Sequence, residues 1–434
     1  MKITFIGSGY VGLVSGVMMS HLGHFVTCLD IDKAKISKLQ NLEIPIFEEG
    51  LGEYLTKYGN TERLNFVCGY NESLYESSII FIAVGTPQGT DGDADLHYIF
   101  EAILTSAKYV NPDCIFVIKS TVPPGTCKKV KELLAQNGFN NQVVSNPEFL
   151  REGSAVHDFL YPDRIVIGCE STSSFEVMRQ IYKPLSDKGI VILETDLITS
   201  ELIKYASNSF LACKIAFINE MADLCEVIGA DINSLSEGVG LDKRIGSAFL
   251  KAGPGFGGSC FPKDILALQH LTNKIKSDFL ILGAVIKANA NRPRLIIDKI
   301  KNFLGGKIQG KKIAVLGLTY KAGTDDLRSS PAIELINSLW NNGAEIKAYD
   351  PQGMSNTYKY FDNKLVCCAS AFEASVGADA IIIATEWPEF KKIDYAKLIL
   401  QLNSPNIIDL RNILDKKMLT NLGYKCYSVG QSND

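Results

Sequence analysis

The first thirty residues constrain the fold of this chain more than any other stretch. An apolar run, KITFI (2–6), leads into GSGYVG, a helix-like segment of small residues and a second apolar run, HFVTCLD (24–30). Gly7, Gly9 and Gly12 have G-x-G-x-x-G spacing between a predicted strand and a predicted helix. In that context they predict a βαβ unit: Gly7 permits a tight turn, Gly9 lets a pyrophosphate approach the backbone, and Gly12 allows close helix–strand packing.

Asp30, at the end of the second predicted strand, indicates which dinucleotide is bound. A carboxylate there accepts hydrogen bonds from the adenosine ribose and repels a 2′-phosphate, so the sequence predicts NAD rather than NADP. Lys35 tempers this preference slightly, since a nearby cation could help to bind a phosphate. A surface turn with an incidental acid is the alternative.

The same segment has no Lys, Arg, Asp or Glu from Ile3 to Leu29, which imitates a signal peptide or a membrane span. Glycines and histidines interrupt it and it lacks a clear cleavage region, so a buried βαβ unit explains it better. No other uncharged stretch is long enough to span a bilayer, and we expect no membrane partner. The formal net charge of −4 gives no electrostatic reason to expect nucleic acid.

The eleven cysteines are scattered, form no C-x-x-C pair and have no ligand spacing with the five histidines. A metal site is therefore not expected. Most of the cysteines, such as Cys28 and Cys114, lie in apolar runs and are interpreted as small buried hydrophobic residues. This usage predicts a reducing, cytoplasmic compartment.

Strand-like runs alternate with helical patterns in both halves of the chain, and a long helical stretch separates them. The fold class predicted is α/β, with two Rossmann-like doubly wound parallel-sheet domains joined by a central helical segment. The N-terminal strand-like runs are 2–6, 24–30, 78–84, 114–120, 142–146 and 164–168. Helical periodicity covers 196–228 and 277–304, and strand-like runs return at 311, before Asp350, in ADAIIIATEW and in NIIDLRN. The expected domains are an NAD-binding domain at 1–195, a helical connector at 196–305 and a second Rossmann-like domain at 306–434.

Small and hydroxyl residues follow two of the predicted strands, in AVGTP (83–87) and KSTVPPGT (119–126). Ligands bind at the carboxyl ends of strands in such sheets, so we expect both loops to line the site. As ordinary loops they would need no explanation, and that alternative stays open.

The stretch KAGPGFGGSCFPKD (251–264) places Cys260 after a run of glycines and before a predicted helix that holds Pro262 in its first turn. The helix dipole lowers the pKa of a thiol at such a position, and Lys263 could add to this. The glycines would let a bulky substrate lie against bare backbone. Cys260 is thus either a nucleophile or a structural cysteine.

Two pairs of polar residues are also candidates. Lys204 and Asn208 share one face of the long middle helix, where the lysine either pairs with an acid or points into a ligand cavity. Glu148 and Glu152, in NPEFLREGSA, are either site residues or a solvated helical pair.

Taken in this order, GSGYVG, STVPPGT, NPEFLREGSA, KYASNSFLA, GFGGSCFPKD and LGLTYKAGTDDLRSSP resemble the UDP-glucose/GDP-mannose dehydrogenase family. The resemblance extends from residue 1 to about residue 430, and Lys35 stands where many relatives have lysine or arginine. It implies a four-electron oxidation in which UDP-glucose, two NAD and water give UDP-glucuronate and two NADH. It also implies that the C-terminal domain, 306–434, binds the UDP-sugar.

The resemblance implies the catalytic roles. Cys260 attacks the C6 aldehyde to give a thiohemiacetal, a second hydride transfer gives a thioester, and water hydrolyses it. Lys204 and Asn208 stabilise the oxyanions. Glu148 serves as acid and base, and Asp264 orients water with Thr121.

Binding residues follow from the same resemblance. The expected cofactor contacts are Gly7, Gly9, Tyr10, Val11, Gly12, Asp30, Lys35, Thr86, Thr121, Glu152, Lys263 and Arg328. The expected substrate contacts are Glu148, Phe149, Leu150, Arg151, Glu152, Lys204, Asn208, Arg244, Phe249, Leu250, Lys251, Ala252, Gly253, Gly257 and Lys321. Arg244 matches an arginine that reaches the substrate of a neighbouring subunit, Arg411 is a weaker candidate, and the helical connector makes a homodimer the expected assembly.

Three other functions compete. A dehydrogenase of GDP-mannose or of a UDP-N-acetylhexosamine would share the scaffold. An epimerase or dehydratase would need a Tyr-x-x-x-Lys pair beside the cofactor, and Tyr360 with Lys364 occurs only in a polar stretch of the far domain. A non-catalytic NAD-binding regulator would have no use for Cys260 together with Lys204.

Overall fold

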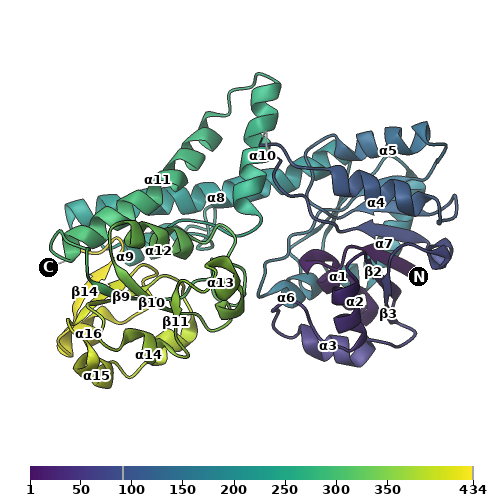
Figure 1. Cartoon of the computed structure of the whole chain (residues 1–434). Coiled ribbons are helices and arrows are strands. Elements are labelled where there is room, and N and C mark those ends of the chain that lie inside the picture. Colours follow the sequence, from purple (N-terminus) through teal and green to yellow (C-terminus); the bar gives the residue numbers. More distant parts are fainter. Residues whose placement is uncertain (90–91, 433–434) are drawn as a thin grey trace. The chain divides into compact units, whose positions relative to one another are not determined.

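The computed structural model describes residues 1–89 and 92–432, which form two compact units (Figure 1). The first unit comprises Met1–Ser207 and Leu266–Lys276. The second comprises Asn208–Ile265 and the chain from Ser277 onward. Each unit has its own sheet and its own hydrophobic cores.

Within the described residues, the first unit contains an eight-stranded sheet of order β3-β2-β1-β4-β5-β6-β7-β8. Its strands are β1 (Lys2–Ile6), β2 (Phe25–Asp30), β3 (Leu64–Cys68), β4 (Ile79–Ile82), β5 (Ile115–Ile118), β6 (Val143–Ser145), β7 (Ile165–Gly168) and β8 (Ile192–Thr195). Neighbouring strands are parallel except β6 and β7, which pair antiparallel between Ser145 and Gly168. The order steps outward from β1 in both directions, as in a doubly wound sheet.

Helices cover both faces of this sheet. They are α1 (Tyr10–His21), α2 (Lys33–Gln40), α3 (Leu51–Tyr58), α4 (His97–Ala107), α5 (Thr126–Gln136), α6 (Ala155–Leu160) and α7 (Thr172–Ser186), with a 3₁₀ turn at Glu72–Glu76. Successive strand residues point to opposite faces, so Ile3 and Phe5 join the core beneath α1 while Ile6 joins the core beneath α4 and α5.

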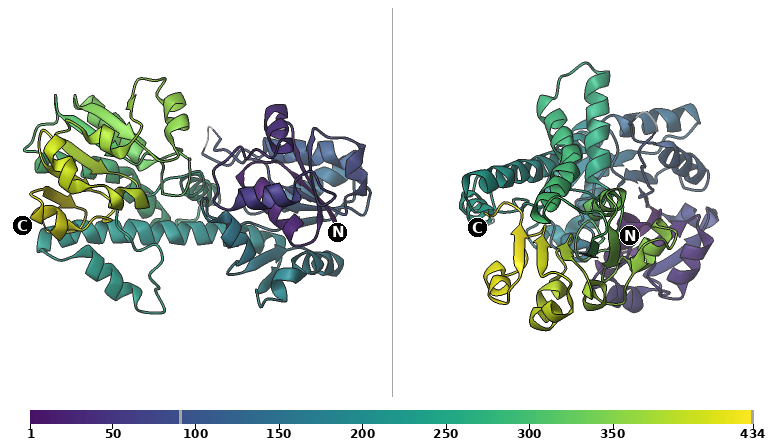
Figure 2. Two further views of the ribbon diagram at one scale, coloured as in Figure 1. Left: turned by 90° about the horizontal axis from the view of Figure 1, so that it is seen from below. Right: turned by 60° about the vertical axis from the view of Figure 1, so that its left-hand side comes forward.

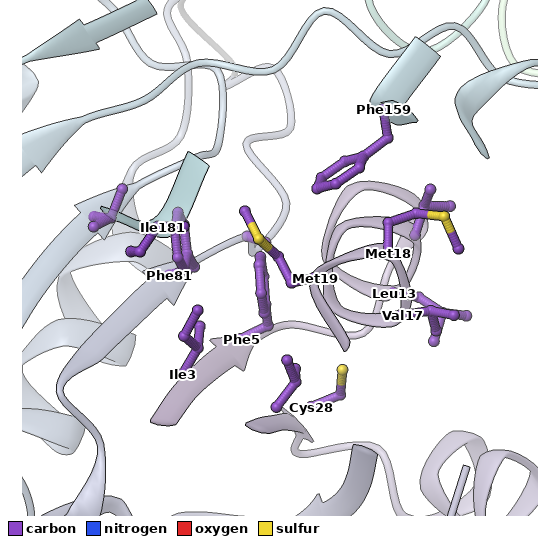
Figure 3. Close-up of a cluster of buried hydrophobic side chains, with 14 of the residues drawn as sticks. Ile3, Phe5, Leu13, Val17, Met18, Met19, Cys28, Phe81, Phe159 and Ile181 are labelled. Atoms are coloured by element: carbon purple, nitrogen blue, oxygen red, sulfur yellow. The ribbon is translucent and has the colours of Figure 1, made fainter. Parts of the chain in front are cut away.

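The uncharged N-terminal stretch is buried as the sequence predicted. Residues Gly12–Ser20 of α1 are all buried. Phe5 and Phe81, from the neighbouring strands β1 and β4, stack with their ring centroids 4.6 Å apart, close to Met19 (Figure 3). Each such side chain contributes about 1.5–3 kcal/mol on burial, and a charge at these positions would be left unpaired.

The second unit contains a six-stranded sheet of order β11-β10-β9-β12-β13-β14 within the described residues. Its strands are β9 (Lys312–Leu316), β10 (Glu345–Tyr349), β11 (Val366–Cys367), β12 (Ala380–Ile383), β13 (Asn406–Asp409) and β14 (Lys425–Ser428). All its neighbouring strands are parallel. Helices α12 (Pro331–Asn341) and α14 (Ala371–Ser375) contribute to the cores on its two opposite faces.

Of the remaining helices, α8 (Leu197–Ile228) and α10 (Phe261–Lys274) each contribute residues to both units, and the others belong to the second unit. Helix α8 is one continuous helix, seen well in Figure 2, and Gly229 at φ 76° ends it. The others are α9 (Ile232–Gly240), α11 (Leu280–Phe303), α13 (Met354–Tyr360), α15 (Tyr395–Leu398) and α16 (Lys416–Asn421), with 3₁₀ turns at Pro388–Lys392 and Ile399–Gln401. The predicted fold class is confirmed.

None of the helices in the described part of the chain combines the length and the apolar character that crossing a membrane requires.

Candidate active site

The turn between β1 and α1 is built around its three glycines. Gly7 has φ 97°, and a Cβ there would lie 2.6 Å from the Ala83 carbonyl oxygen. A Cβ on Gly12 would lie 1.8 Å from the Gly7 carbonyl oxygen, whereas one on Gly9 would meet nothing within 4 Å. Gly9 is also the N-cap of α1 and brings no capping side chain. The first N–H groups of α1 are thus left for an anion, so these residues fit a dinucleotide pyrophosphate.

Asp30 lies beside this turn and is held by three donors. Its carboxylate accepts hydrogen bonds from the N–H of Ser8 (2.8 Å), the N–H of Asp32 (3.0 Å) and Lys35 Nζ (2.9 Å). Burial acts to raise the pKa of Asp30, but these donors outweigh burial and the pKa lies below its usual value. Lys35 is therefore engaged by Asp30 itself, and an ionised Asp30 fits recognition of a ribose hydroxyl.

The two loops at the strand ends, AVGTP and KSTVPPGT, are bonded to each other. Thr86 Oγ1 donates to the Thr121 carbonyl oxygen at 3.0 Å, and Ser120 Oγ donates to the Val84 carbonyl oxygen at 2.6 Å. Glu201, which was not predicted from the sequence, accepts hydrogen bonds from the N–H groups of Gly125 and Cys127 at the start of α5. The carboxylate therefore fixes the second loop to α8.

Lys204 and Glu148 form a buried ion pair in the first unit. Lys204 Nζ lies 3.0 Å from Glu148 Oε1, and both side chains are less than a tenth exposed. Glu148 Oε2 also accepts a hydrogen bond from the N–H of Leu150. Of the two expectations for Lys204, pairing with an acid is the one observed, and the acid is itself a predicted site residue.

A second buried lysine, Lys119, neighbours this pair. Its Nζ donates to the carbonyl oxygen of Asn146 (3.3 Å) and to Asn146 Oδ1 (3.2 Å). Burial lowers the pKa of Lys119 to about 8, with Glu148 acting to raise it and Lys204 acting to lower it further. Lys119 and Asn146 were not predicted from the sequence, although a lysine that ends the apolar run CIFVIKS was a visible signal.

The alternative interpretation of Glu148 and Glu152 as a solvated helical pair is wrong. Residues 146–151 are not helical, and Glu148 is only 5% exposed. Strand β6 ends at Ser145, and Pro147, which has no backbone N–H to continue the pairing, follows shortly after. Asn146 Nδ2 donates across to the Val166 carbonyl oxygen at 2.7 Å. The chain then runs as an extended loop until α6 begins at Ala155.

The rest of this loop is packed by charged and aromatic groups. The guanidinium of Arg164 lies 3.6 Å from the ring centroid of Phe149. Arg151 forms a two-bonded ion pair with Asp158. The N–H of Gly153 donates to the hydroxyl of Tyr10 at 2.7 Å, which ties the loop to the first turn of α1. Val11, the next residue, contributes to the core beneath that turn.

Cys260 occupies the N-cap position of α10 in the second unit. Its carbonyl oxygen accepts the N–H of Asp264 at 3.0 Å, the helix begins at Phe261, and Pro262 is its second residue. Asp264 is 1% exposed and accepts hydrogen bonds from Asn208 Nδ2 (2.6 Å) and Lys263 Nζ (2.5 Å). The structure thus brings Asn208, Lys263 and Asp264 together one turn beyond the thiol.

The glycines before Cys260 are packed against the chain itself. A Cβ on Gly257 would lie 2.0 Å from the Ser329 carbonyl oxygen, and one on Gly258 would lie 2.8 Å from the ring of Tyr320. The side of the backbone on which a Cβ would lie is therefore filled by the chain itself at Gly257 and Gly258, and the substrate contact expected of Gly257 stays a prediction. Close approach of residues 320–329 explains glycine at both positions.

Residues 249–253 are mostly buried and held by helices α8 and α9. Phe249 adopts φ 63°, Leu250 is 3% exposed and Ala252 is 5% exposed, whereas Lys251 is exposed. The N–H of Gly253 donates to Asn219 Oδ1 at 2.8 Å. Lys251 is therefore the exposed side chain of this segment.

The remaining predicted cations of the second unit have different surroundings. Arg328 is paired with Asp326, Arg244 is paired with Asp242 and 89% exposed, and Lys321 Nζ lies 5.6 Å from the centroid of the Tyr320 ring. Arg411 donates to the carbonyl oxygens of Ala384 (2.8 Å) and Tyr320 (3.0 Å). Arg411 therefore links loops within its own unit.

Six of the other ten cysteines are buried, three are partly buried and Cys68 is exposed. All cysteines of the described chain are present as thiols, and burial raises the pKa of Cys28 and of Cys114 to about 12. Across residues 1–89 and 92–432, no group of three or more His, Cys, Asp or Glu side chains could hold a metal ion.

Comparison with known proteins gives consistent matches along the chain. Residues 1–186, 198–291 and 314–416 match the NAD binding, central and UDP binding domains of the UDP-glucose/GDP-mannose dehydrogenase family. A UDP-glucose 6-dehydrogenase from Rickettsia bellii is 57% identical over 431 residues, which cover 99% of each chain. A protein of that name from Bacillus subtilis is 44% identical over 99% of this chain and 98% of its own. The structure of a UDP-glucose dehydrogenase from Pyrobaculum islandicum has a TM-score of 0.91 and 35% identity, covering 99% of this chain and 98% of that one.

Proposed function

The chain belongs to the UDP-glucose/GDP-mannose dehydrogenase family, and on that basis we propose that it oxidises UDP-glucose to UDP-glucuronate with NAD. It is an NAD-dependent oxidoreductase. Relatives named for UDP-glucose at 55–57% identity over nearly full length favour that substrate over the other nucleotide sugars.

The observation that carries a covalent mechanism is the position of Cys260. Its thiol lies at the start of α10, where the helix dipole favours a thiolate. The buried carboxylate of Asp264 lies one turn further on, bonded to Asn208 and Lys263. A structural cysteine would need none of these neighbours.

The reaction is R–CH₂OH + 2 NAD⁺ + H₂O → R–COO⁻ + 2 NADH + 3 H⁺, and NAD, when bound, supplies the hydride acceptor. Glu148 takes the hydroxyl proton as the alcohol becomes an aldehyde. The Cys260 sulfur then adds to the aldehyde carbon and restores a tetrahedral centre that can lose a second hydride. Water displaces the sulfur from the resulting thioester, which returns the thiolate and releases the carboxylate.

Neighbouring groups of the chain stabilise each charge that develops. Lys204 and Asn208, four residues apart on α8, donate to the alkoxide-like oxygen at C6. Asp264 and Thr121 orient the attacking water. The Lys204–Glu148 ion pair supports these roles, since it keeps a proton donor and an acceptor 3.0 Å apart in a buried setting.

We also propose that the chain works as a homodimer through α8. Phe210, Phe217, Leu224 and Ile228 repeat along one side of this helix and are 46–67% exposed. A row of large apolar side chains of this kind favours a protein partner. Arg244, exposed in the turn that follows α9, then reaches the neighbouring subunit's substrate. The domain division at residues 195 and 305 and the cytoplasmic location stay predictions.

The substrate is tested by supplying the purified protein with NAD and limiting amounts of single nucleotide sugars. We expect two NADH per UDP-glucose, followed at 340 nm, and a kcat/KM at least about tenfold lower for GDP-mannose and UDP-N-acetylmannosamine. A higher kcat/KM for either of those sugars would overturn the substrate assignment. No net NADH from any of them would favour an epimerase.

A further inference from the structure

The segment Gly253–Phe256, which precedes Cys260, is held by side chains from α8 and α11. Arg292 Nε donates to the carbonyl oxygen of Gly253 at 3.0 Å, and Asn219 Oδ1 accepts the N–H of the same residue. Asn289 bonds to both backbone groups of Phe256: its Oδ1 accepts the N–H at 2.9 Å and its Nδ2 donates to the carbonyl oxygen at 3.2 Å. Side chains therefore provide hydrogen-bond partners for four backbone groups, the N–H and C=O of Gly253 and of Phe256, which are not bonded within a sheet or a helix.

The packing at this point leaves no spare room. Gly255, between the two bonded residues, has φ 121°, and a Cβ there would lie 3.0 Å from Asn289 Oδ1 and 3.7 Å from Arg292 Cγ. The two α11 side chains therefore define the path of the backbone as well as its hydrogen bonds.

Burying the charged side chain of Arg292 at this position costs stability. It is 2% exposed, and its Nη1 is paired with Asp223, which also binds Lys299. Its Nη2 is buried and makes no hydrogen bond within the described chain. A buried guanidinium with an unsatisfied donor costs stability, and an apolar side chain would fill the space at lower cost. The bond to Gly253 is what such a side chain could not supply.

The held segment is connected to the catalytic thiol by aromatic packing. The ring of Phe256 lies edge-on to the ring of Phe261 with centroids 6.2 Å apart, and the ring of Phe249 lies 6.1 Å from the same ring. Phe261 is the first residue of α10 and follows Cys260 directly. A shift of Phe256 is therefore transmitted to the residue next to the thiol.

We propose that Asn289 and Arg292 are positioning residues that fix the glycine-rich segment and, through Phe256 and Phe261, the place of the Cys260 thiol. This inference rests on the proposed function, in which the thiol is needed only after the first oxidation. Loosening the segment therefore impairs capture of the aldehyde more than the first hydride transfer.

The test compares Asn289→Ala and Arg292→Lys with two matched controls on the exposed side of the same helix, Asn291→Ala and Arg294→Lys. Arg292→Lys keeps a cation for Asp223 but loses the planar Nε donor. Asn289→Asp, a further variant, keeps the acceptor for the Phe256 N–H and loses the donor to its carbonyl oxygen. Thermal unfolding of each protein checks the fold first.

We expect kcat to fall about 10- to 100-fold in Asn289→Ala and Arg292→Lys, as small misplacements of reacting groups do, with Asn289→Asp in between. The KM for NAD should stay within about twofold, because no cofactor residue is touched. The NADH released per UDP-glucose should fall below two, and semicarbazide should trap free aldehyde. The control variants should match the wild type.

Alkylation separates the positioning role from the proposed function. The rate at which iodoacetamide modifies Cys260, followed by peptide mass spectrometry, should change at least threefold in the two variants and in neither control. If the wild type forms no acid, the proposed function fails, while this rate still reports on positioning. Folded Asn289→Ala and Arg292→Lys proteins with wild-type kcat, stoichiometry and alkylation rate would overturn the inference.

Discussion

Three charged side chains, Lys119, Glu148 and Lys204, share one buried region of the first unit, and only one of them is an acid. Lys204 pairs directly with Glu148, whereas Lys119 is bonded to the neutral Asn146. Tyr182 also donates to Asn146 Oδ1, at 2.5 Å. Because Lys119 and Lys204 are both buried here, each positive charge disfavours the other, and Glu148 is the carboxylate that offsets them. The proposed mechanism requires Glu148 to take a proton, and Lys204 is a charged group within hydrogen-bond distance of it.

Lys119→Met tests the charge in this region through the pH dependence of stability. Burial lowers the pKa of Lys119 to about 8, whereas an unfolded lysine titrates near 10.4. Below pH 8 the lysine is charged in both states and its burial costs stability. As the pH rises from 8 to 10.4, the folded protein loses the proton first, so wild-type stability gains from this group.

The advantage of Lys119→Met over the wild type should therefore shrink by on the order of 3 kcal/mol between pH 7.5 and 10.5, as measured by urea unfolding. Lys128→Met, an exposed lysine on α5, should show a difference from the wild type that does not vary with pH. A pH-independent difference for Lys119→Met as well would contradict the buried charge.

At the level of elements, the loop before α10 is shaped by close contacts at three of its glycines. Gly255 packs on α11, Gly257 on the carbonyl oxygen of Ser329, and Gly258 on the ring of Tyr320. The N–H of Gly258 also donates to the Arg328 carbonyl oxygen at 3.0 Å. The loop joins α9 to α10 and packs against α11 and against residues 320–329. These contacts together determine the position of Cys260.

Gly257→Ala should destabilise the second unit, because its Cβ would overlap the Ser329 carbonyl oxygen at 2.0 Å. Overpacking of this kind costs about 1–3 kcal/mol, and more where backbone must move. Gly238→Ala is the control: this glycine lies inside α9, and a Cβ there would meet nothing within 4 Å, so alanine should stabilise by about 0.5–1 kcal/mol. Urea unfolding distinguishes the two, and equal effects would contradict the packing account.

The strands that were not predicted from the sequence are β3, β8, β11 and β14, and these are the edge strands of the two sheets. Central strands such as β4 and β5 are buried throughout and appear as continuous apolar runs, whereas β3 and β8 alternate or face solvent. Position in the sheet, which the local sequence does not contain, decides how apolar a strand must be.

The sequence predicts a candidate site as a set of residues but does not predict the contacts among them. Cys260 at a helix start and the glycine turn at Gly7 are local features that spacing reveals. The bonds from Lys204 to Glu148 and from Asn208 to Asp264 each join residues 56 positions apart. Only the folding of the sheet and of α8 and α10 creates them, and the same holds for the Asn289–Phe256 bonds.

At the scale of the whole molecule, both units have a glycine turn after their central strand, β1 or β9, but the carboxylate beside that turn has different partners in each unit. Gly317, at φ 89°, donates its N–H to the Tyr349 carbonyl oxygen at the end of β10 at 2.8 Å, as Gly7 donates to the Leu29 carbonyl oxygen near the end of β2. Asp350 follows that strand where Asp30 ends its own, but Asp350 is fully buried and accepts hydrogen bonds from Leu318, Trp387 and Gly353, among others. Its oxygens are occupied, so the second unit keeps the turn without a carboxylate for a ribose.

The proposed homodimer is tested by Phe217→Asp, which places a charge in the exposed apolar row of α8. Sedimentation equilibrium should show a dimer for the wild type and a monomer for the variant, because burying an unpaired carboxylate at an interface is costly. Leu400→Asp, at an apolar residue that is 79% exposed elsewhere in the second unit, should stay dimeric. A dimeric Phe217→Asp protein, or a monomeric wild type, would show that α8 is not the interface.

In the proposed mechanism Cys260 turns one oxidation into two, and product stoichiometry in Cys260→Ala tests this role most directly. Cys213→Ala, a partly exposed cysteine on α8, serves as the control. With NAD and limiting UDP-glucose, the wild type and the control should give two NADH and one UDP-glucuronate per sugar. Cys260→Ala should give no UDP-glucuronate and at most one NADH per sugar. Full acid formation with two NADH by Cys260→Ala would contradict the account.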